Sequence, residues 1–188
     1  MKIKNAEQLE NLLIANGIDF ALWGQGNAKY VIDLWNEMIS GESIIQENPL
    51  IRLVAVVQIV IRNTDGRILI EVEQELADGR IRSRNRAPAE KMKPAESYSS
   101  AAIRCLEEEL GLSADKVKLI KPTYKQIQEL KDSPSYPGLQ SKYIFHIIEA
   151  KVLGLPDTDF WTDEATYNGK DPVRKHHWAW VEEKGIPS

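Results

Sequence analysis

The chain has 188 residues, of which 24 are lysine or arginine and 28 are aspartate or glutamate, giving a net charge of −4. This length is enough for one domain with a hydrophobic core, and the charge excludes a broad basic field that attracts nucleic acid. A single cysteine excludes an intramolecular disulfide, and we find neither a signal-peptide core nor an apolar run of about 20 residues, so we expect a cytoplasmic protein without a membrane span.

Residues 1–48 are predicted to form an N-terminal helical extension. One helix is expected from Asn5 to about Asn16 and another from about Ala28 to Ser40. Their leucine and tryptophan side chains recur at helical spacing, which favours a packed core. We expect these helices to pack on the main domain, residues 49–188, or on a partner subunit in a homodimer.

The next stretch has the pattern of three strands joined by tight turns. Leu53 to Ile61 is nearly all Val and Ile, which is typical of a strand buried on both faces. A turn at residues 63–66 leads into a second strand, Ile68 to Leu76. The pair Asp78-Gly79 is expected to turn the chain into a third strand, Arg80 to Arg86.

Four arginines alternate along the third strand, so they share one face. One interpretation is a wall that binds phosphate, because guanidinium groups suit bidentate phosphate contacts. The other is a solvated ladder of cross-strand ion pairs, which a two-residue loop favours. That ladder would pair Glu75 with Arg82, Glu73 with Arg84 and Glu71 with Arg86. Arg84 and Arg86 are the candidate substrate contacts, since they lie nearest in sequence to the acidic helix that follows.

Residues 96–112 predict a helix that is dense in acids. The helical period places Ala102, Ile103, Leu106 and Leu110 on the core side, and Cys105, Glu108 and Glu109 together on a flank. Arg104 can orient Glu108 through an i,i+4 ion pair, and Gly111 ends the helix. Because closely packed carboxylates repel each other, this pattern indicates a bound divalent cation and, with it, a phosphate. The alternative is an amphipathic surface helix whose acids face water.

Residues 90–112 resemble the Nudix box, a family pattern of Gly, five residues, Glu, seven residues, Arg-Glu, an aliphatic residue, any residue, Glu-Glu, any residue, Gly and an aliphatic residue. The spacing is intact, and the matching positions are Glu96, Arg104, Leu106, Glu108, Glu109, Gly111 and Leu112. The strands around the box also fit the family layout. The resemblance implies an α/β fold, namely a Nudix-type α/β/α sandwich around a mixed β-sheet, here with an N-terminal helical extension.

The resemblance also implies an activity, the hydrolysis of a nucleoside diphosphate linked to another moiety. Mg²⁺ or Mn²⁺ would be held by Glu108 and Glu109, and water would attack a phosphorus atom. Arg104 and Glu96 would orient the carboxylates. Lys91 stands where many members of the family carry a lysine near the phosphates.

Two positions depart from the box. Glu90 replaces its first glycine, and Cys105 replaces the glutamate after the arginine, so one of three helical carboxylates is missing. Glu90 is a candidate replacement metal ligand, and the alternative is a solvated loop glutamate. Both departures favour a competing interpretation, a Nudix-fold module that has lost efficient catalysis and binds a nucleotide or a protein.

After the box, we expect a strand from Val117 to Leu130 that Pro122 interrupts, a loop from Asp132 to Leu139, and a strand from Tyr143 to Val152. Tyr136 in that loop can stack on a nucleobase or pack as a loop anchor.

The last segment contains tryptophans and histidines. Trp161, Trp178 and Trp180 are expected in the core. His176 and His177 are adjacent, so they point to opposite faces of a strand and cannot share a metal. Asp163 and Glu164 are alternative candidates for a general base outside the box, because such bases occur in this family.

Overall fold

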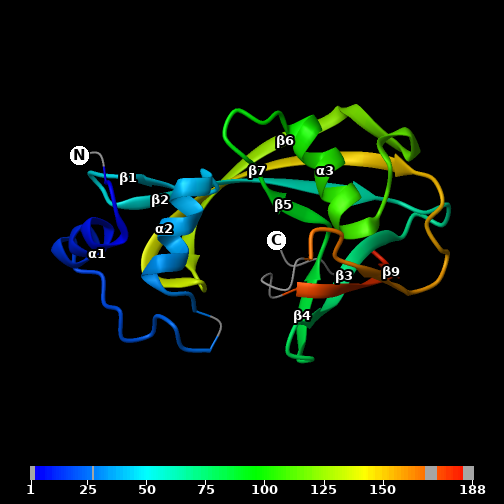
Figure 1. The fold of residues 1–188 in the computed structure, drawn as a ribbon. Helices are drawn as coiled ribbons and strands as arrows, with labels where there is room; N and C mark the ends of the chain where they lie inside the picture. The colour runs from blue at the N-terminus through cyan, green and yellow to red at the C-terminus, as the bar shows by residue number, and fades with distance from the viewer. Residues whose placement is uncertain (1–2, 27, 168–172, 184–188) are drawn as a thin grey trace. The chain divides into compact units, whose positions relative to one another are not determined.

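The computed structural model describes residues 3–26, 28–167 and 173–183 (Figure 1). The chain divides into two compact units. The first unit consists of Met1–Val56, Lys91–Glu96 and Ile127–Phe145, and the second unit consists of Val57–Glu90, Ser97–Gln126 and His146–Ser188. The predicted division into residues 1–48 and 49–188 stays a prediction.

The first unit contains the two expected N-terminal helices. Helix α1 spans Ala6–Ala15 and helix α2 spans Val31–Ser40. The Asn5 side chain caps α1 by accepting a hydrogen bond from the Gln8 N–H at 2.9 Å. Gly41 ends α2 in a left-handed conformation, with φ at 77°.

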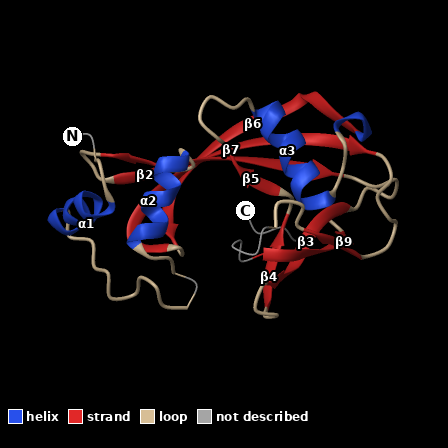
Figure 2. Cartoon of the chain, viewed as in Figure 1, coloured by secondary structure: helices blue, strands red, loops and turns tan. Residues whose placement is uncertain are grey.

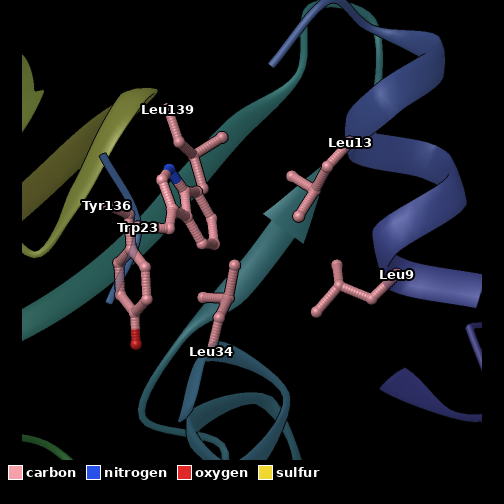
Figure 3. Close-up of a cluster of buried hydrophobic side chains, with 6 residues drawn as sticks. All are labelled: Leu9, Leu13, Trp23, Leu34, Tyr136 and Leu139. Atoms are coloured by element: carbon pink, nitrogen blue, oxygen red, sulfur yellow. The ribbon is translucent and has the colours of Figure 1, made fainter. Parts of the chain in front are cut away.

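The core of the first unit is a cluster of buried apolar side chains. Figure 3 shows its members, which are Leu9, Leu13, Trp23, Leu34, Tyr136 and Leu139. The indole N–H of Trp23 donates to the carbonyl of Pro137 at 2.8 Å. The N-terminal helices therefore pack on residues near 136 of the same chain, which is one of the two expected arrangements.

The strands form two sheets (Figure 2). The five-stranded sheet has the order β1 (Ile44–Gln46), β2 (Ile51–Ile61), β7 (Tyr136–Val152) and β6 (Val117–Ser133), and β5 (Ala89–Lys91) also pairs with β2. The four-stranded sheet has the order β4 (Ile81–Arg86), β3 (Ile68–Leu76), β9 (Val173–Val181) and β8 (Phe160–Asp163). Every residue of β2 is buried or half-buried, as its run of Val and Ile predicts.

The segment between β6 and β7 differs from its prediction. The expected loop from Asp132 to Leu139 is mostly strand, since β6 ends at Ser133 and β7 begins at Tyr136. Pro122 also lies inside β6 rather than interrupting it. This position is tolerated because β6 is the edge strand of its sheet, where a missing N–H leaves no neighbour unpaired.

The acidic helix forms as predicted. Helix α3 spans Tyr98–Leu110, with Ser97 as its N-cap and Gly111 as its left-handed C-cap. A short 3₁₀ turn, Ala114–Lys116, follows it. The predicted α/β fold with an N-terminal helical extension is confirmed. Within the described part of the chain, no helix is long and apolar enough to cross a membrane.

Candidate functional site

Helix α3 turns one of its two paired glutamates inward. Glu109 is 8% exposed, and its Oε2 atom is buried without a hydrogen-bond partner among the described residues. Burial raises the pKa of this carboxyl well above its usual value, and the charges of Glu71, Glu90 and Glu164 raise it further against the opposing effect of His176. The flank of the helix is therefore part of the interior of the second unit, rather than a solvated surface.

Glu71 of β3 is the centre of a buried network of charges. It is 2% exposed, and its Oε1 lies 2.6 Å from Nδ1 of His176. Its Oε2 accepts a hydrogen bond from Nε of Arg84 at 3.1 Å and lies 3.9 Å from Nε of Arg86. Both candidate arginines are therefore brought to one buried carboxylate of the second unit.

A bulge explains why two arginines reach the same glutamate. The pairing of β3 with β4 shifts between Glu71 and Glu73, and Asn85 has a φ of 53°. Asn tolerates this left-handed conformation better than most residues, and a bulge of this kind redirects the neighbouring side chains.

The predicted ion ladder is correct at one of its three positions. Glu71 faces Arg86, but Glu73 faces Ser83, and Gln74 instead of Glu75 faces Arg82. The length of the turn explains the other two positions. The Leu76 N–H donates to the Arg80 carbonyl at 2.8 Å, so the loop between the strands has three residues instead of the predicted two. A one-residue change in loop length shifts the register of the strand that follows.

His176 of β9 bridges two carboxylates. It is 2% exposed, its Nδ1 contacts Glu71, and its Nε2 lies 3.0 Å from Oε2 of Glu164. Burial opposes its charge, but the hydrogen bonds to Glu164 and Glu71 outweigh this effect and raise its pKa to about 9. The pKa of Glu164 is lowered, since its hydrogen bonds to His176 and Thr166 outweigh its burial. His176 is thus an imidazolium between two carboxylates at neutral pH.

The neighbouring aromatic residues face different surroundings. His177 contacts Glu73 at 3.3 Å and stacks on Trp161, with their ring centroids 4.6 Å apart. The two histidines therefore point away from each other, as predicted. Trp178 and Trp180 lie in the core as expected, but Trp161 is 44% exposed, because its ring lies on the outer side of β8 with His177.

Glu108, the other glutamate of the pair, forms the ion pair predicted for it. Its Oε2 accepts a hydrogen bond from Nη1 of Arg104 at 3.0 Å, and the side chain is 25% exposed. The segment after β8 holds the end of the helix. The Thr162 hydroxyl donates to the carbonyl of Glu109 at 2.5 Å, and the Ala165 N–H donates to the carbonyl of Glu108 at 2.9 Å.

Cys105 and Glu90, the two departures from the box, lie close to Glu109. Burial raises the pKa of the Cys105 thiol well above its usual value, and the charges of Glu109 and Glu90 raise it further. A thiol in this environment stays protonated and is a poor nucleophile. The charge of Glu90 acts on both Cys105 and Glu109.

Three predicted site residues belong to the first unit. The Glu96 carboxylate accepts a hydrogen bond from the Lys93 N–H at 2.8 Å. Lys91 forms ion pairs with Glu37 at 2.7 Å and with Glu42 at 3.2 Å. Tyr136 is fully buried in the apolar cluster, so its ring is a packing anchor and is covered on the side where a nucleobase would stack.

The donor set near Glu109 suits a small, hard cation. No group of three or more His, Cys, Asp or Glu side chains is already arranged around one point in the described residues. Mg²⁺, however, is commonly bound by one or two carboxylates together with water and substrate phosphates. The Oε2 atom of Glu109, which has no partner among the residues described and feels the charges of three other acids as well as that of His176, fits such an ion.

Comparison with known proteins places the chain in a family. Among solved structures, it is similar to an Ap4A hydrolase from C. elegans, with 15% identity, 68% of this chain and 79% of that chain covered, and a TM-score of 0.39. A MutT protein from Methanosarcina mazei Go1 has 18% identity, covers 69% of this chain and 77% of its own, and has a TM-score of 0.40. The comparison with curated proteins gave no match. The family model of the NUDIX domain matches residues 52–184, which is most of the chain, and the chain therefore belongs to the NUDIX domain family.

Proposed function

We propose that the chain is a metal-dependent pyrophosphohydrolase that acts on a nucleoside diphosphate linked to another moiety. The observation that carries this proposal is the Glu109 carboxylate, which is buried near other acids and has one oxygen without a hydrogen-bond partner in the part of the chain that the structure describes. A buried carboxylate in such a field takes up a proton or needs a nearby cation. A divalent ion beside the substrate phosphates would meet that need in the working enzyme.

The proposed roles follow from the contacts of each side chain. Glu108 and Glu109 would hold Mg²⁺ or Mn²⁺, with Glu90 as a further ligand. Such an ion supplies positive charge to the phosphoryl oxygens and acidifies the attacking water. Arg104 orients the Glu108 carboxylate through their 3.0 Å contact. A stacking role for Tyr136 is not part of the proposal, because that ring is buried.

The arginines of β4 are proposed to contact the substrate. Arg86 is half exposed, with 49% of its side chain accessible, whereas Arg84 is 17% exposed and bound to Glu71. Arg86 is therefore the better candidate to bind a phosphate, and Arg84 to hold Glu71 in place. The roles of Glu96 and Lys91, in orienting the carboxylates and in binding phosphate, stay part of the proposal.

A binding module without turnover is the second candidate function. The observation that favours it is Cys105, a buried and protonated thiol in place of a box carboxylate. Such a module would bind a nucleotide or a protein through the same fold without hydrolysing a phosphoanhydride. The two candidates differ in whether the natural chain turns over any substrate.

The test is a turnover screen with Mg²⁺ and Mn²⁺ over nucleoside diphosphate derivatives. We expect the natural chain to hydrolyse the phosphoanhydride to a nucleoside monophosphate and the phosphorylated moiety. Glu109→Gln should lower kcat by at least about 100-fold, because it removes the proposed metal ligand that is most deeply buried. Glu107→Gln, an exposed acid of the same helix, should leave turnover unchanged. Activity that appears only after Cys105→Glu would instead support the binding module.

A further inference from the structure

Glu164 lies on a segment that is fastened to the acidic end of α3. The segment follows β8, and hydrogen bonds from Thr162 and Ala165 to the carbonyls of Glu109 and Glu108 hold it on either side of Glu164. Thr162 is itself fixed, because its hydroxyl accepts a hydrogen bond from the Trp178 indole at 2.8 Å. The backbone thus places Glu164 beside the end of the helix that carries the paired glutamates.

The side chain of Glu164 is fixed as firmly as its backbone. One oxygen contacts His176 at 3.0 Å, and the other accepts hydrogen bonds from the Thr166 N–H at 2.9 Å and the Thr166 hydroxyl at 2.5 Å. His176 cannot swing away, because its other ring nitrogen contacts the buried Glu71. Glu71 is in turn held by Arg84. A chain of contacts therefore runs from β4 through β3 and β9 to the segment that holds Glu164.

This chain of contacts ends at a carboxylate that the box does not contain. The charge of Glu164 reaches the buried Glu109 and adds to the other acids against the opposing charge of His176. The Oε2 atom of Glu109 lacks a partner in the described ranges, which is the independent observation that points to a cation site. The same helix lacks one carboxylate, because position 105 is a cysteine. An ionised acid at Glu164 restores the negative charge of the site without being one of its ligands.

We propose that His176 is a positioning residue that holds Glu164 beside Glu109, where Glu164 supplies the negative charge lost with Cys105. This inference rests on the proposed function, because it needs a cation at Glu109. It goes beyond that function, since it assigns a role to two residues outside the box.

The test measures Mn²⁺ affinity of the full chain by electron paramagnetic resonance of the free ion, so that no turnover is needed. We expect Glu164→Gln to raise the Kd for Mn²⁺ by roughly 10- to 100-fold, as is usual for residues that support a metal site indirectly. His176→Gln should raise the Kd less, because it frees Glu164 but also removes a positive charge that acts on Glu109. Asp163→Asn is the matched control. Asp163 precedes Glu164 in the chain and carries the same charge, but its side chain is 83% exposed. Removing this charge should leave the Kd for Mn²⁺ unchanged.

Two double variants separate a positioning role from a structural one. If His176 supports the ion by holding Glu164, the variant with both changes binds Mn²⁺ no more weakly than Glu164→Gln does. Cys105→Asp in the Glu164→Gln background should recover most of the affinity, because it returns a carboxylate of similar volume to the helix. Additive losses in the first variant, or no recovery in the second, would overturn the inference.

Glu109→Gln distinguishes this inference from the function on which it rests. If Glu109→Gln abolishes Mn²⁺ binding while Glu164→Gln binds as the natural chain does, the inference is wrong and the proposed function stands. If the natural chain binds no Mn²⁺, or Glu109→Gln retains full affinity, the proposed function fails and the inference fails with it. Thermal unfolding of each variant confirms that the protein is folded, and Glu164→Gln carries the test if His176→Gln does not fold.

Discussion

His176 is charged at neutral pH because each of its ring nitrogens has a carboxylate partner. A neutral imidazole has one donor and one acceptor, and its acceptor nitrogen would face a carboxylate oxygen. Placing a second proton on the ring turns that contact into a charge-assisted hydrogen bond. The side chains of His176 and Glu71 are both almost fully buried. The charge of His176 therefore contributes to folding stability as well as to the geometry of the site.

The charge of His176 predicts a loss of stability at alkaline pH. Its pKa in the folded chain is about 9, above the value of about 6.5 in an unfolded chain. Its contribution is therefore complete below about pH 6.5 and is lost as the pH rises to about 9, with an upper magnitude of about 3 kcal/mol. Urea unfolding across this range measures the loss. His176→Gln should abolish the slope and His177→Gln should keep it, and a slope that survives His176→Gln would contradict the assignment.

Burial separates residues that look alike in the sequence. Glu71, Glu73 and Glu75 alternate along one strand, but the pairing of β3 with β9 shifts between Glu71 and Glu73, and of the three only Glu71 is buried. His176 and His177 are likewise neighbours of one type, and the register of β9 decides which of them faces the interior. The sequence pattern of the box identifies Glu109, because its spacing is local. Partners on β3 and β9 depend on strand register, which a single sequence does not fix.

At the scale of elements, one buried ion pair joins helix α2 to strand β2. Glu37 of α2 and Arg52 of β2 are both almost fully buried, with 2.7 Å between Oε2 and Nη2. Ser43 bonds to both side chains, and Lys91 adds a second cation at 2.7 Å. Burial alone would raise the pKa of Glu37, but these cations lower it well below its usual value.

Breaking this pair should destabilise the first unit strongly. Glu37→Gln leaves the buried guanidinium of Arg52 without its counter-charge, which typically costs about 3–5 kcal/mol. Glu42→Gln removes a more exposed partner of Lys91 and should cost less than about 1 kcal/mol. Urea unfolding at pH 7 compares the two variants. Equal losses would show that the buried pair contributes no more than a surface contact.

Most elements were predictable from local patterns, and the misses share one cause. The helices end at capping residues and the strand Ile68–Leu76 has the predicted bounds, because both signals are local. The region around Tyr136 was predicted as a loop on account of its prolines and glycine. The pairing of β6 with β7 outweighs the local preference of these residues for a loop. Local sequence patterns do not predict which strands pair, because strand pairing depends on tertiary contacts. The burial of Tyr136 follows from that pairing.

At the scale of the whole molecule, the buried Glu109 carboxylate in the field of its neighbouring acids should make the ion-free chain less stable than it would be with a cation bound. Carboxylates that repel each other raise the free energy of the folded state, whereas the unfolded chain separates them. The protein also has a net charge of −4, so no general excess of positive charge offsets this local repulsion. A ligand that binds only the folded chain stabilises it by mass action.

Mn²⁺ should therefore raise the midpoint of thermal unfolding. At one hundred times its Kd, an ion stabilises the folded state by about 2.7 kcal/mol, which for a chain of this size is a shift of roughly 5 to 10 °C. Glu109→Gln should start from a higher ion-free midpoint, because it removes one of the repelling acids, and should show no shift with Mn²⁺. Glu107→Gln should shift as the natural chain does. Calorimetry with and without Mn²⁺ checks all three, and an unchanged midpoint of the natural chain at millimolar Mn²⁺ would mean that the buried acid holds a proton instead of a metal ion.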